Sequence, residues 1–351
     1  MADSTSGRRV KLNREMVPTG NSSFWDGRRV LVTGAGGFIA SHLVELLVAQ
    51  GASVRGFVRY NSRSDRGWLD RLDHAILDEV DVFTGDFVNP EAVTNAIKGC
   101  EIVLHLGALI PIPYSYQHPR EFVETNIVGT LNVLEAARRM DLNRIVQVST
   151  SEVYGSAQTV PIPEEHPLHP QSPYAATKVG ADQLALSYAR AFDLPVVVAR
   201  PFNTFGPRQS ARAVIPTIIT QALTRDHIEL GTTSTTRDFL YVTDTASGIA
   251  RCAEVDDVVG EVFNLGSGRE ISIGEVIERV FTAVGRDLPV VQADERLRPP
   301  GSEVDRLCAS VDKARTRLGW EAAVGFDDGL RATIDWISTS LDTYKSAIYN
   351  V

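Results

Sequence analysis

The glycine-rich segment TGAGGFIA, at residues 33–40, is the feature that most constrains the fold of this chain. It follows a short β-branched apolar stretch and precedes a segment whose apolar residues recur at helical spacing. Glycines in such a turn let the backbone approach a pyrophosphate, and the start of the following helix offers unpaired N–H groups. Because the flanking strand and helix supply the required context, the motif predicts a dinucleotide site. Its residues would be Gly34, Gly36, Gly37, Phe38 and Ile39.

Short apolar strands alternate with helical segments from Arg28 to about residue 200. The expected strands are Val30–Thr33, Ser53–Val58, Ile102–Leu106, Ile145–Ser149 and Val196–Ala199. Their nearly continuous apolar character is typical of strands that are buried on both faces of a parallel sheet. The sequence therefore predicts the α/β class, with a Rossmann-type doubly wound parallel sheet over residues 28–200.

The composition of the chain changes after Pro201: proline and glycine become frequent, and the predicted strands and helices become shorter. The expected helices are Val214–Leu223, Thr243–Val255, Ile273–Val284 and Asp327–Ser340. We expect a smaller, mixed α/β substrate domain over residues 201–351, interleaved with the first domain through a returning segment near 241–265. Residues 1–27 are expected to form a polar extension.

Composition excludes several classes of function. The 351 residues carry a net charge of −9, which argues against broad binding to nucleic acids or anionic membranes. There is no apolar run long enough to span a bilayer, and the N-terminal residues lack the apolar stretch of a signal peptide. Three scattered cysteines suggest neither a disulfide framework nor a metal site. We expect a cytoplasmic protein without a bound metal.

The residues after the second strand bear on the choice between NAD and NADP. An acidic residue there commonly binds the ribose 2′-hydroxyl of NAD, but this chain has Arg59, Asn61, Ser62 and Arg63. Guanidinium groups suit a 2′-phosphate, so NADP is modestly favoured over NAD. The alternative is a solvated loop of arginines.

A second group of residues completes the predicted cofactor site. Asp86 follows the third strand and could receive the adenine amino group, or could cap the helix that begins near Asn89. Phe87 beside it, with Leu106 and Ala108 at the end of a later strand, would form further walls of the site.

The segment SPYAATK, at residues 172–178, places Tyr174 and Lys178 one helical turn apart on one face. A phenol with a pKa near 10 is a poor base at neutral pH. A neighbouring ammonium and a positive nicotinamide ring would both stabilise the phenolate and lower that pKa. Tyr174 could then accept a proton from a hydroxyl group that is being oxidised.

Together these motifs resemble the extended short-chain dehydrogenases/reductases that act on nucleotide sugars. The resemblance covers roughly residues 28–340 and includes TGAGGFIA, YAATK, RPFNTFGPR (200–208), RDFLYVTD (237–244), FNLGSG (263–268) and LGW (318–320). It implies a substrate site in the C-terminal domain, with Tyr174 and Lys178 in contact with both cofactor and substrate. It also implies a homodimer formed through a four-helix bundle that includes the Tyr174 helix.

The segment STSEVYG, at residues 149–155, resembles that of the 4,6-dehydratases within this family. The resemblance assigns a hydrogen bond to Thr150, makes Ser151 and Glu152 part of the catalytic set, and lets Glu152 remove the C5 proton. Oxidation at C4 acidifies that proton. Water then leaves from C6, and the stored hydride returns to C6, so that a tightly bound cofactor is regenerated in each turnover.

Three alternatives stay open at this point. UDP-glucuronate decarboxylases also carry TSEVYG, and 4-epimerases share the fold and the Tyr-Lys pair. Ser151 stands where many dTDP-glucose 4,6-dehydratases have Asp, which leaves the acid for the departing hydroxyl undecided. A dinucleotide-binding regulatory protein without turnover is an alternative of another class.

The resemblance extends to the nucleotide-diphosphate sugar. Asn203, Arg237 and Arg298 match positions that bind the diphosphate, and Glu303 could bind the ribose hydroxyls. Ala213 and Val214 begin a loop that would pack against the base, and Ser115 lies in a segment expected to border the sugar. Longer stretches resemble the nucleotide-activated N-acetylglucosamine 4,6-dehydratases of legionaminic-acid pathways. This implies a UDP- or GDP-activated N-acetylhexosamine, and because that group is usually NAD-dependent, the cofactor choice stays open.

Overall fold

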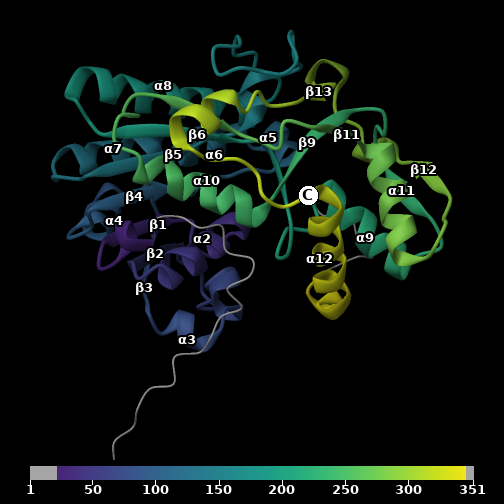
Figure 1. The fold of residues 1–351 in the computed structure, drawn as a ribbon, viewed down its shortest axis with the longest axis horizontal. Coiled ribbons are helices and arrows are strands. Elements are labelled where there is room, and N and C mark those ends of the chain that lie inside the picture. Colours follow the sequence, from purple (N-terminus) through teal and green to yellow (C-terminus); the bar gives the residue numbers. More distant parts are fainter. Residues whose placement is uncertain (1–21, 345–351) are drawn as a thin grey trace, which may run out of the picture.

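The computed structural model describes residues 22–344, and a seven-stranded parallel sheet forms its centre (Figure 1). The strand order is β10-β6-β5-β4-β1-β2-β3, and every neighbouring pair in it is parallel. The strands are β1 Arg29–Thr33, β2 Ser53–Arg59, β3 Val80–Gly85, β4 Ile102–His105, β5 Arg144–Val148, β6 Val196–Pro201 and β10 Val262–Leu265. The predicted Rossmann-type fold class is confirmed.

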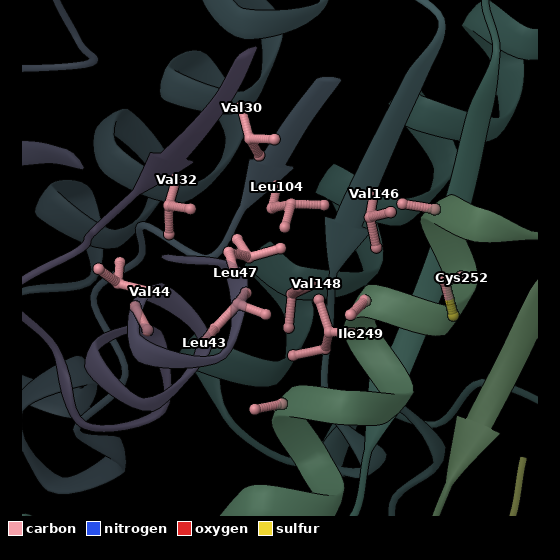
Figure 2. Close-up of a cluster of buried hydrophobic side chains, with 14 of the residues drawn as sticks. Val30, Val32, Leu43, Val44, Leu47, Leu104, Val146, Val148, Ile249 and Cys252 are labelled. Carbon is pink, nitrogen blue, oxygen red and sulfur yellow. The ribbon is translucent and has the colours of Figure 1, made fainter. Parts of the chain in front are cut away.

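Helices cover both faces of this sheet. Val30 and Val32 of β1 pack with residues of α2 and α10 on one face, and Figure 2 shows this cluster. Leu31, which points the other way, packs with residues of α4, α7 and α8. Alternate residues of one strand thus enter two separate cores, which is why these strands are almost wholly apolar. The helices are α2 Phe38–Ala49, α4 Pro90–Ile97, α7 Gly129–Arg138, α8 Pro173–Phe192 and α10 Val242–Glu254.

A smaller sheet and three further helices make up most of the C-terminal part. Strand β9 Thr236–Tyr241 lies at the centre of this sheet, antiparallel to β11 Glu270–Ser272 and parallel to β13 Arg306–Leu307 and β7 Asn203–Phe205. The helices are α9 Val214–Thr224, α11 Ile273–Val284 and α12 Phe326–Thr339, and β8 Ile228–Leu230 pairs with β12 Val290–Gln292. Four short helices complete the set: α1 Ser22–Trp25, α3 His74–Leu77, α5 Ile112–Gln117 and α6 Pro119–Phe122.

The chain leaves the large sheet after β6 and later returns to it. Strand β9 belongs to the small sheet, α10 then packs in the same core as α2, and β10 pairs with β6 in the large sheet. The returning segment expected near residues 241–265 corresponds to α10 and β10. The four helices expected after Pro201 agree with α9 to α12 within one residue at each end.

The N-terminal boundary expected at residue 27 is wrong. Trp25 is fully buried in the core with α2 and α10, and its indole N–H donates to Glu254 at 2.6 Å. Trp25 therefore does not belong to a polar extension, and residues 1–21 lie outside the described part of the chain. Between residues 22 and 344, no helix has the length and apolar character that a membrane span needs.

Candidate active site

The glycine-rich turn between β1 and α2 adopts a backbone that a larger residue would not fit. Gly34 has a φ of +67°, and a Cβ atom there would lie 2.9 Å from the Gly107 Cα. The Gly37 N–H donates to the Gly34 carbonyl at 2.8 Å, which closes the turn. No side chain caps the N-terminus of α2 at Gly37, so this end of the helix can receive a phosphate.

A cavity of about 420 Å³ opens at this turn. Eight of the predicted cofactor residues line it: Gly34, Gly36, Gly37, Arg59, Asn61, Asp86, Phe87 and Ala108. The predicted Phe38, Ile39, Ser62, Arg63 and Leu106 do not line this cavity, and neither do Tyr174 and Lys178. The sequence also missed several lining residues, among them Asp65, Arg66, Leu109 and Thr125.

Residues 61–71 form a strap that closes one side of the cavity. The Trp68 N–H donates to the Gly36 carbonyl at 2.9 Å, and a Cβ atom on Gly36 would lie 2.3 Å from the Arg66 carbonyl oxygen. The Asn61 side chain fixes the strap, because its carbonyl oxygen accepts from the N–H groups of Arg63 and Asp65. Gly36 is therefore required by the strap as well as by a ligand.

Arg59 and Asp86 face each other at the mouth of the cavity. The Arg59 Nε lies 3.9 Å from Asp86 Oδ2, and both side chains are exposed. Asp86 does not cap the following helix, because Asn89 accepts from the N–H groups of Glu91 and Ala92 instead. Arg59 thus already has an anionic neighbour, which weakens the argument that it serves a 2′-phosphate.

Tyr174 and Lys178 lie on the first turns of α8. Ser172 caps this helix by accepting from the Ala175 N–H at 3.1 Å, and Pro173 occupies its first position. Tyr174 is 7% exposed and hydrogen-bonds the Thr150 hydroxyl. The Lys178 Nζ donates to the Val148 carbonyl at 2.7 Å, at the carboxyl end of β5. Chemistry is expected at this end of a doubly wound sheet.

Burial sets the protonation of this pair in the protein alone. It raises the pKa of Tyr174, and the nearby Glu152 and Asp182 carboxylates raise it further, while the Thr150 hydrogen bond opposes them. Burial lowers the pKa of Lys178 to about 8, and Asp182 opposes that change. The pKa of Tyr174 in the protein alone is thus raised, because desolvation of the phenolate is the largest effect, and the lowering expected from Lys178 together with a bound nicotinamide stays a prediction.

A buried polar network links α8 to the large sheet. Asp182 Oδ2 accepts from the Ser149 hydroxyl at 2.8 Å and from the Arg200 Nε at 3.1 Å, and both charged side chains are almost fully buried. Arg200 also donates to the Tyr154 hydroxyl at 2.9 Å, which in turn donates to Asn264. The network joins β5, α8, β6 and β10, so it fixes the catalytic helix on the sheet.

Glu152 lies in a cluster of two carboxylates and two guanidinium groups. The Arg298 Nη1 is 3.6 Å from Glu152 Oε2, and the Arg237 Nη2 is 3.5 Å from Glu303 Oε1. Glu152 is also close enough to raise the pKa of Tyr174. The structure thus brings the predicted elimination base, two predicted diphosphate ligands and the predicted ribose ligand into one group.

The remaining predicted substrate residues lie in different settings. Asn203 has a buried Oδ1 atom without a hydrogen-bond partner, and it follows β6 at the start of β7. Ala213 caps α9, and Val214 is the first residue of that helix. Ser115 is fully buried and donates to the Ile112 carbonyl at 2.7 Å, so its hydroxyl serves α5. Ser151 is also buried.

Asn126 connects the cavity at the glycine turn with α8, and no sequence pattern pointed to it. Its side chain exchanges hydrogen bonds with the backbone of Leu109 at 2.8 and 2.9 Å, and it donates to the Thr177 hydroxyl at 3.0 Å. It lies in a π-helical turn, Val123–Val128, a rare conformation that is frequent at functional sites.

The comparisons with known proteins agree with this geometry. A family model described as GDP-mannose 4,6-dehydratase matches residues 31–333. The chain belongs to this family. It is an enzyme of the extended short-chain dehydrogenase/reductase type, as the motifs predicted, whereas the legionaminic-acid resemblance stays a prediction.

Two curated relatives are each 33% identical to the chain and match 88% of it. One is the low-salt glycan biosynthesis protein Agl12 of Haloferax volcanii, of which 97% is covered. The other is a dTDP-glucose 4,6-dehydratase of Streptomyces niveus, of which 92% is covered. A UDP-glucuronate 4-epimerase of Thermodesulfobacterium geofontis is 31% identical over 90% of the chain, so the relatives of the chain include nucleotide-sugar dehydratases and epimerases.

Solved structures of both reaction types resemble the fold. The dTDP-glucose 4,6-dehydratase DesIV of Streptomyces venezuelae, with NAD and TYD bound, is 29% identical with a TM-score of 0.80 and covers 90% of this chain and 99% of its own. The UDP-glucose 4-epimerase of Thermotoga maritima, with UDP-glucose, is 27% identical with a TM-score of 0.81 and covers 89% and 99%. The fold therefore does not separate dehydration from epimerisation.

Proposed function

We propose that the protein is an NAD(P)-dependent nucleotide-sugar 4,6-dehydratase. It oxidises C4 of the sugar, eliminates water across C5 and C6, and reduces C6 with the same hydride. The observation that carries the proposal is the position of Glu152, a carboxylate next to Thr150 and close to Tyr174. Elimination needs a base at C5 in addition to the base at C4, whereas epimerisation at C4 does not.

The glycine turn and its cavity fit a nicotinamide dinucleotide. Gly34, Gly36 and Gly37 line the cavity, and the uncapped N-terminus of α2 suits the pyrophosphate. Asp86 lines the cavity and is proposed to receive the adenine amino group, and the Arg59 beside it leaves both NAD and NADP compatible with the site. Once bound, the nicotinamide supplies the acceptor and later the donor of the hydride.

The residues of the chain then handle the protons. Tyr174 accepts the proton of the C4 hydroxyl, and Thr150 orients the phenol through its hydrogen bond. Since burial opposes the phenolate, the reaction needs the positive charges of Lys178 and the nicotinamide to offset it. Glu152 removes the C5 proton once C4 is a ketone.

The substrate is proposed to be a UDP- or GDP-activated N-acetylhexosamine. Its diphosphate would bind Arg237 and Arg298, with the Asn203 amide N–H as an added donor, and Glu303 would bind the ribose. The base would pack near Ala213 and Val214 at the start of α9. A homodimer through α8 and a cytoplasmic location are further predictions.

Mass spectrometry of reaction mixtures tests the proposed function. The protein is incubated with UDP- and GDP-N-acetylglucosamine, and with dTDP-glucose as a comparison sugar. A product lighter by the mass of one water is expected from an N-acetylhexosamine. If only dTDP-glucose gives a dehydrated product, the proposed 4,6-dehydration is supported and the proposed N-acetylhexosamine substrate is refuted.

A 4-epimerase or a UDP-glucuronate decarboxylase is the second candidate. Ser151 favours it, because its buried hydroxyl is a weaker acid for the departing C6 oxygen than a carboxyl group would be. An isomer of unchanged mass, or loss of carbon dioxide from UDP-glucuronate, would establish this candidate. Tyr174→Phe should abolish turnover for either candidate and leave dinucleotide binding intact. If the native protein binds the dinucleotide but shows no turnover, it is the dinucleotide-binding regulatory protein.

A further inference from the structure

Glu152 and Arg298 form an ion pair with each other, although the proposed function requires each of them to act on a different part of the substrate. Glu152 must act on the C5 proton, and Arg298 must bind the substrate diphosphate. In the structure each faces the other at 3.6 Å, with side-chain exposures of 12% for Glu152 and 26% for Arg298.

The pair is loose, and its geometry leaves Arg298 able to take another anion. The Arg298 Nη1 is buried but has no hydrogen-bond partner, because Glu152 lies beyond hydrogen-bond distance. A buried donor without an acceptor is unfavourable, so an oxygen placed at Nη1 would gain a hydrogen bond that Glu152 does not supply.

The arginines of the cluster already have anionic neighbours without a ligand. Glu152 and Glu303 face Arg298 and Arg237, and Asp305 is a further carboxylate near Arg237. A diphosphate adds two negative charges to this set. The carboxylates must then give up at least part of their contact with the arginines.

We propose that Arg298 exchanges partners during turnover: it holds Glu152 in the ligand-free site and turns to the substrate diphosphate, which frees the carboxylate to act at C5. This rests on the proposed function and adds a coupling to it. The elimination base becomes available only when a nucleotide-diphosphate sugar is seated. A bound cofactor alone would leave Glu152 paired.

A double-mutant cycle on ligand affinity tests the exchange without turnover. The dissociation constants of UDP, GDP and dTDP are measured by calorimetry for the NAD-loaded full-length protein, for Glu152→Gln, for Arg298→Met and for the double variant. If Glu152 competes with the diphosphate for Arg298, Glu152→Gln tightens binding about fivefold, as expected for a partly buried ion pair. In the Arg298→Met background the same change should alter binding by less than about twofold.

Simple repulsion between Glu152 and the diphosphate would give a different result. The effect of Glu152→Gln would then be the same in both backgrounds, and the proposed exchange would be refuted. Arg298→Lys keeps the charge and should restore part of the coupling, which separates the exchange from damage to the fold. Glu270 and Arg306 are a matched control, because they pair on the small sheet outside the cluster. Glu270→Gln should leave the affinity unchanged.

The outcome also separates this inference from the proposed function. If none of the three nucleoside diphosphates binds, both the substrate class and the exchange are refuted. If one binds but the cycle shows no coupling, the exchange alone is refuted and the dehydratase proposal stands.

Discussion

Asp182→Asn tests whether the network behind α8 sets the chemistry of Lys178 as well as its position. Asp182 is fully buried and accepts hydrogen bonds from Ser149 and Arg200. The substitution keeps the shape of the side chain but removes its charge. Two effects should follow, one on stability and one on the pH dependence of turnover.

The stability effect comes from Arg200, which would keep its charge in a buried site without an anion. Breaking a buried pair by removing one partner costs about 3–5 kcal/mol. The amide oxygen can still accept one of the two hydrogen bonds, so we expect a value of about 3 kcal/mol in the free energy of unfolding. This would lower the unfolding midpoint by roughly 4 °C in a thermal scan of a chain of this length.

The pH effect comes from Lys178. Burial lowers the pKa of Lys178 to about 8, and Asp182 is the anion that opposes this. Without that anion the charged ammonium is less favourable, so the pKa of Lys178 must fall further. The alkaline limb of the kcat/KM profile should move to lower pH, by about one unit.

Ser149→Ala is the matched control for Asp182→Asn. It removes one hydrogen bond to Asp182 but keeps the carboxylate, so it should cost about 1 kcal/mol of stability and leave the alkaline limb in place. An equal shift of the limb in both variants would show that the network acts only on structure. An unchanged limb in Asp182→Asn would refute the electrostatic role.

Three further predictions concern the cofactor site and the contact between the two parts of the chain. Gly36→Ala places a methyl group 2.3 Å from the Arg66 carbonyl oxygen, so the affinity for NAD measured by calorimetry should weaken at least tenfold. In the control Gly274→Ala the new methyl group meets no atom closer than 3.8 Å, so this variant should bind NAD normally. Asp86→Asn removes the anion next to Arg59, so the ratio of NADP to NAD affinity should rise severalfold, and a fall would contradict the role of Arg59. Arg208→Met breaks a two-bond ion pair with α2 and should lower the free energy of unfolding by about 1–2 kcal/mol in denaturant titration, and no change would show that the pair is unimportant.

The sequence predicted what depends on short-range patterns. The apolar strands, the glycine turn and the Tyr174–Lys178 pair each involve one element and its sequence neighbours. The periodicity of the apolar residues and the short motifs were therefore sufficient to predict them. The helices after Pro201 were predicted within one residue, because their apolar faces repeat regularly.

Contacts between distant segments could not be predicted in this way. The strap over Gly36 depends on an Asn61 side chain that folds residues 61–65, and Trp25 is buried only because α10 returns from the C-terminal part. The pairing of Glu152 with Arg298 joins residues 146 positions apart (298 minus 152). No local pattern specifies such a pair, although it joins the predicted elimination base to a predicted diphosphate ligand.

The central claim is that hydride removed from C4 returns to C6 after Glu152 has promoted the loss of water. A nucleotide sugar carrying deuterium at C4 tests it directly, with the position of the label read by NMR in the product. A 4-keto product with the deuterium at C6 and none at C4 is expected. Deuterium that returns to C4 in a product of unchanged mass would contradict it and assign the protein to the epimerases.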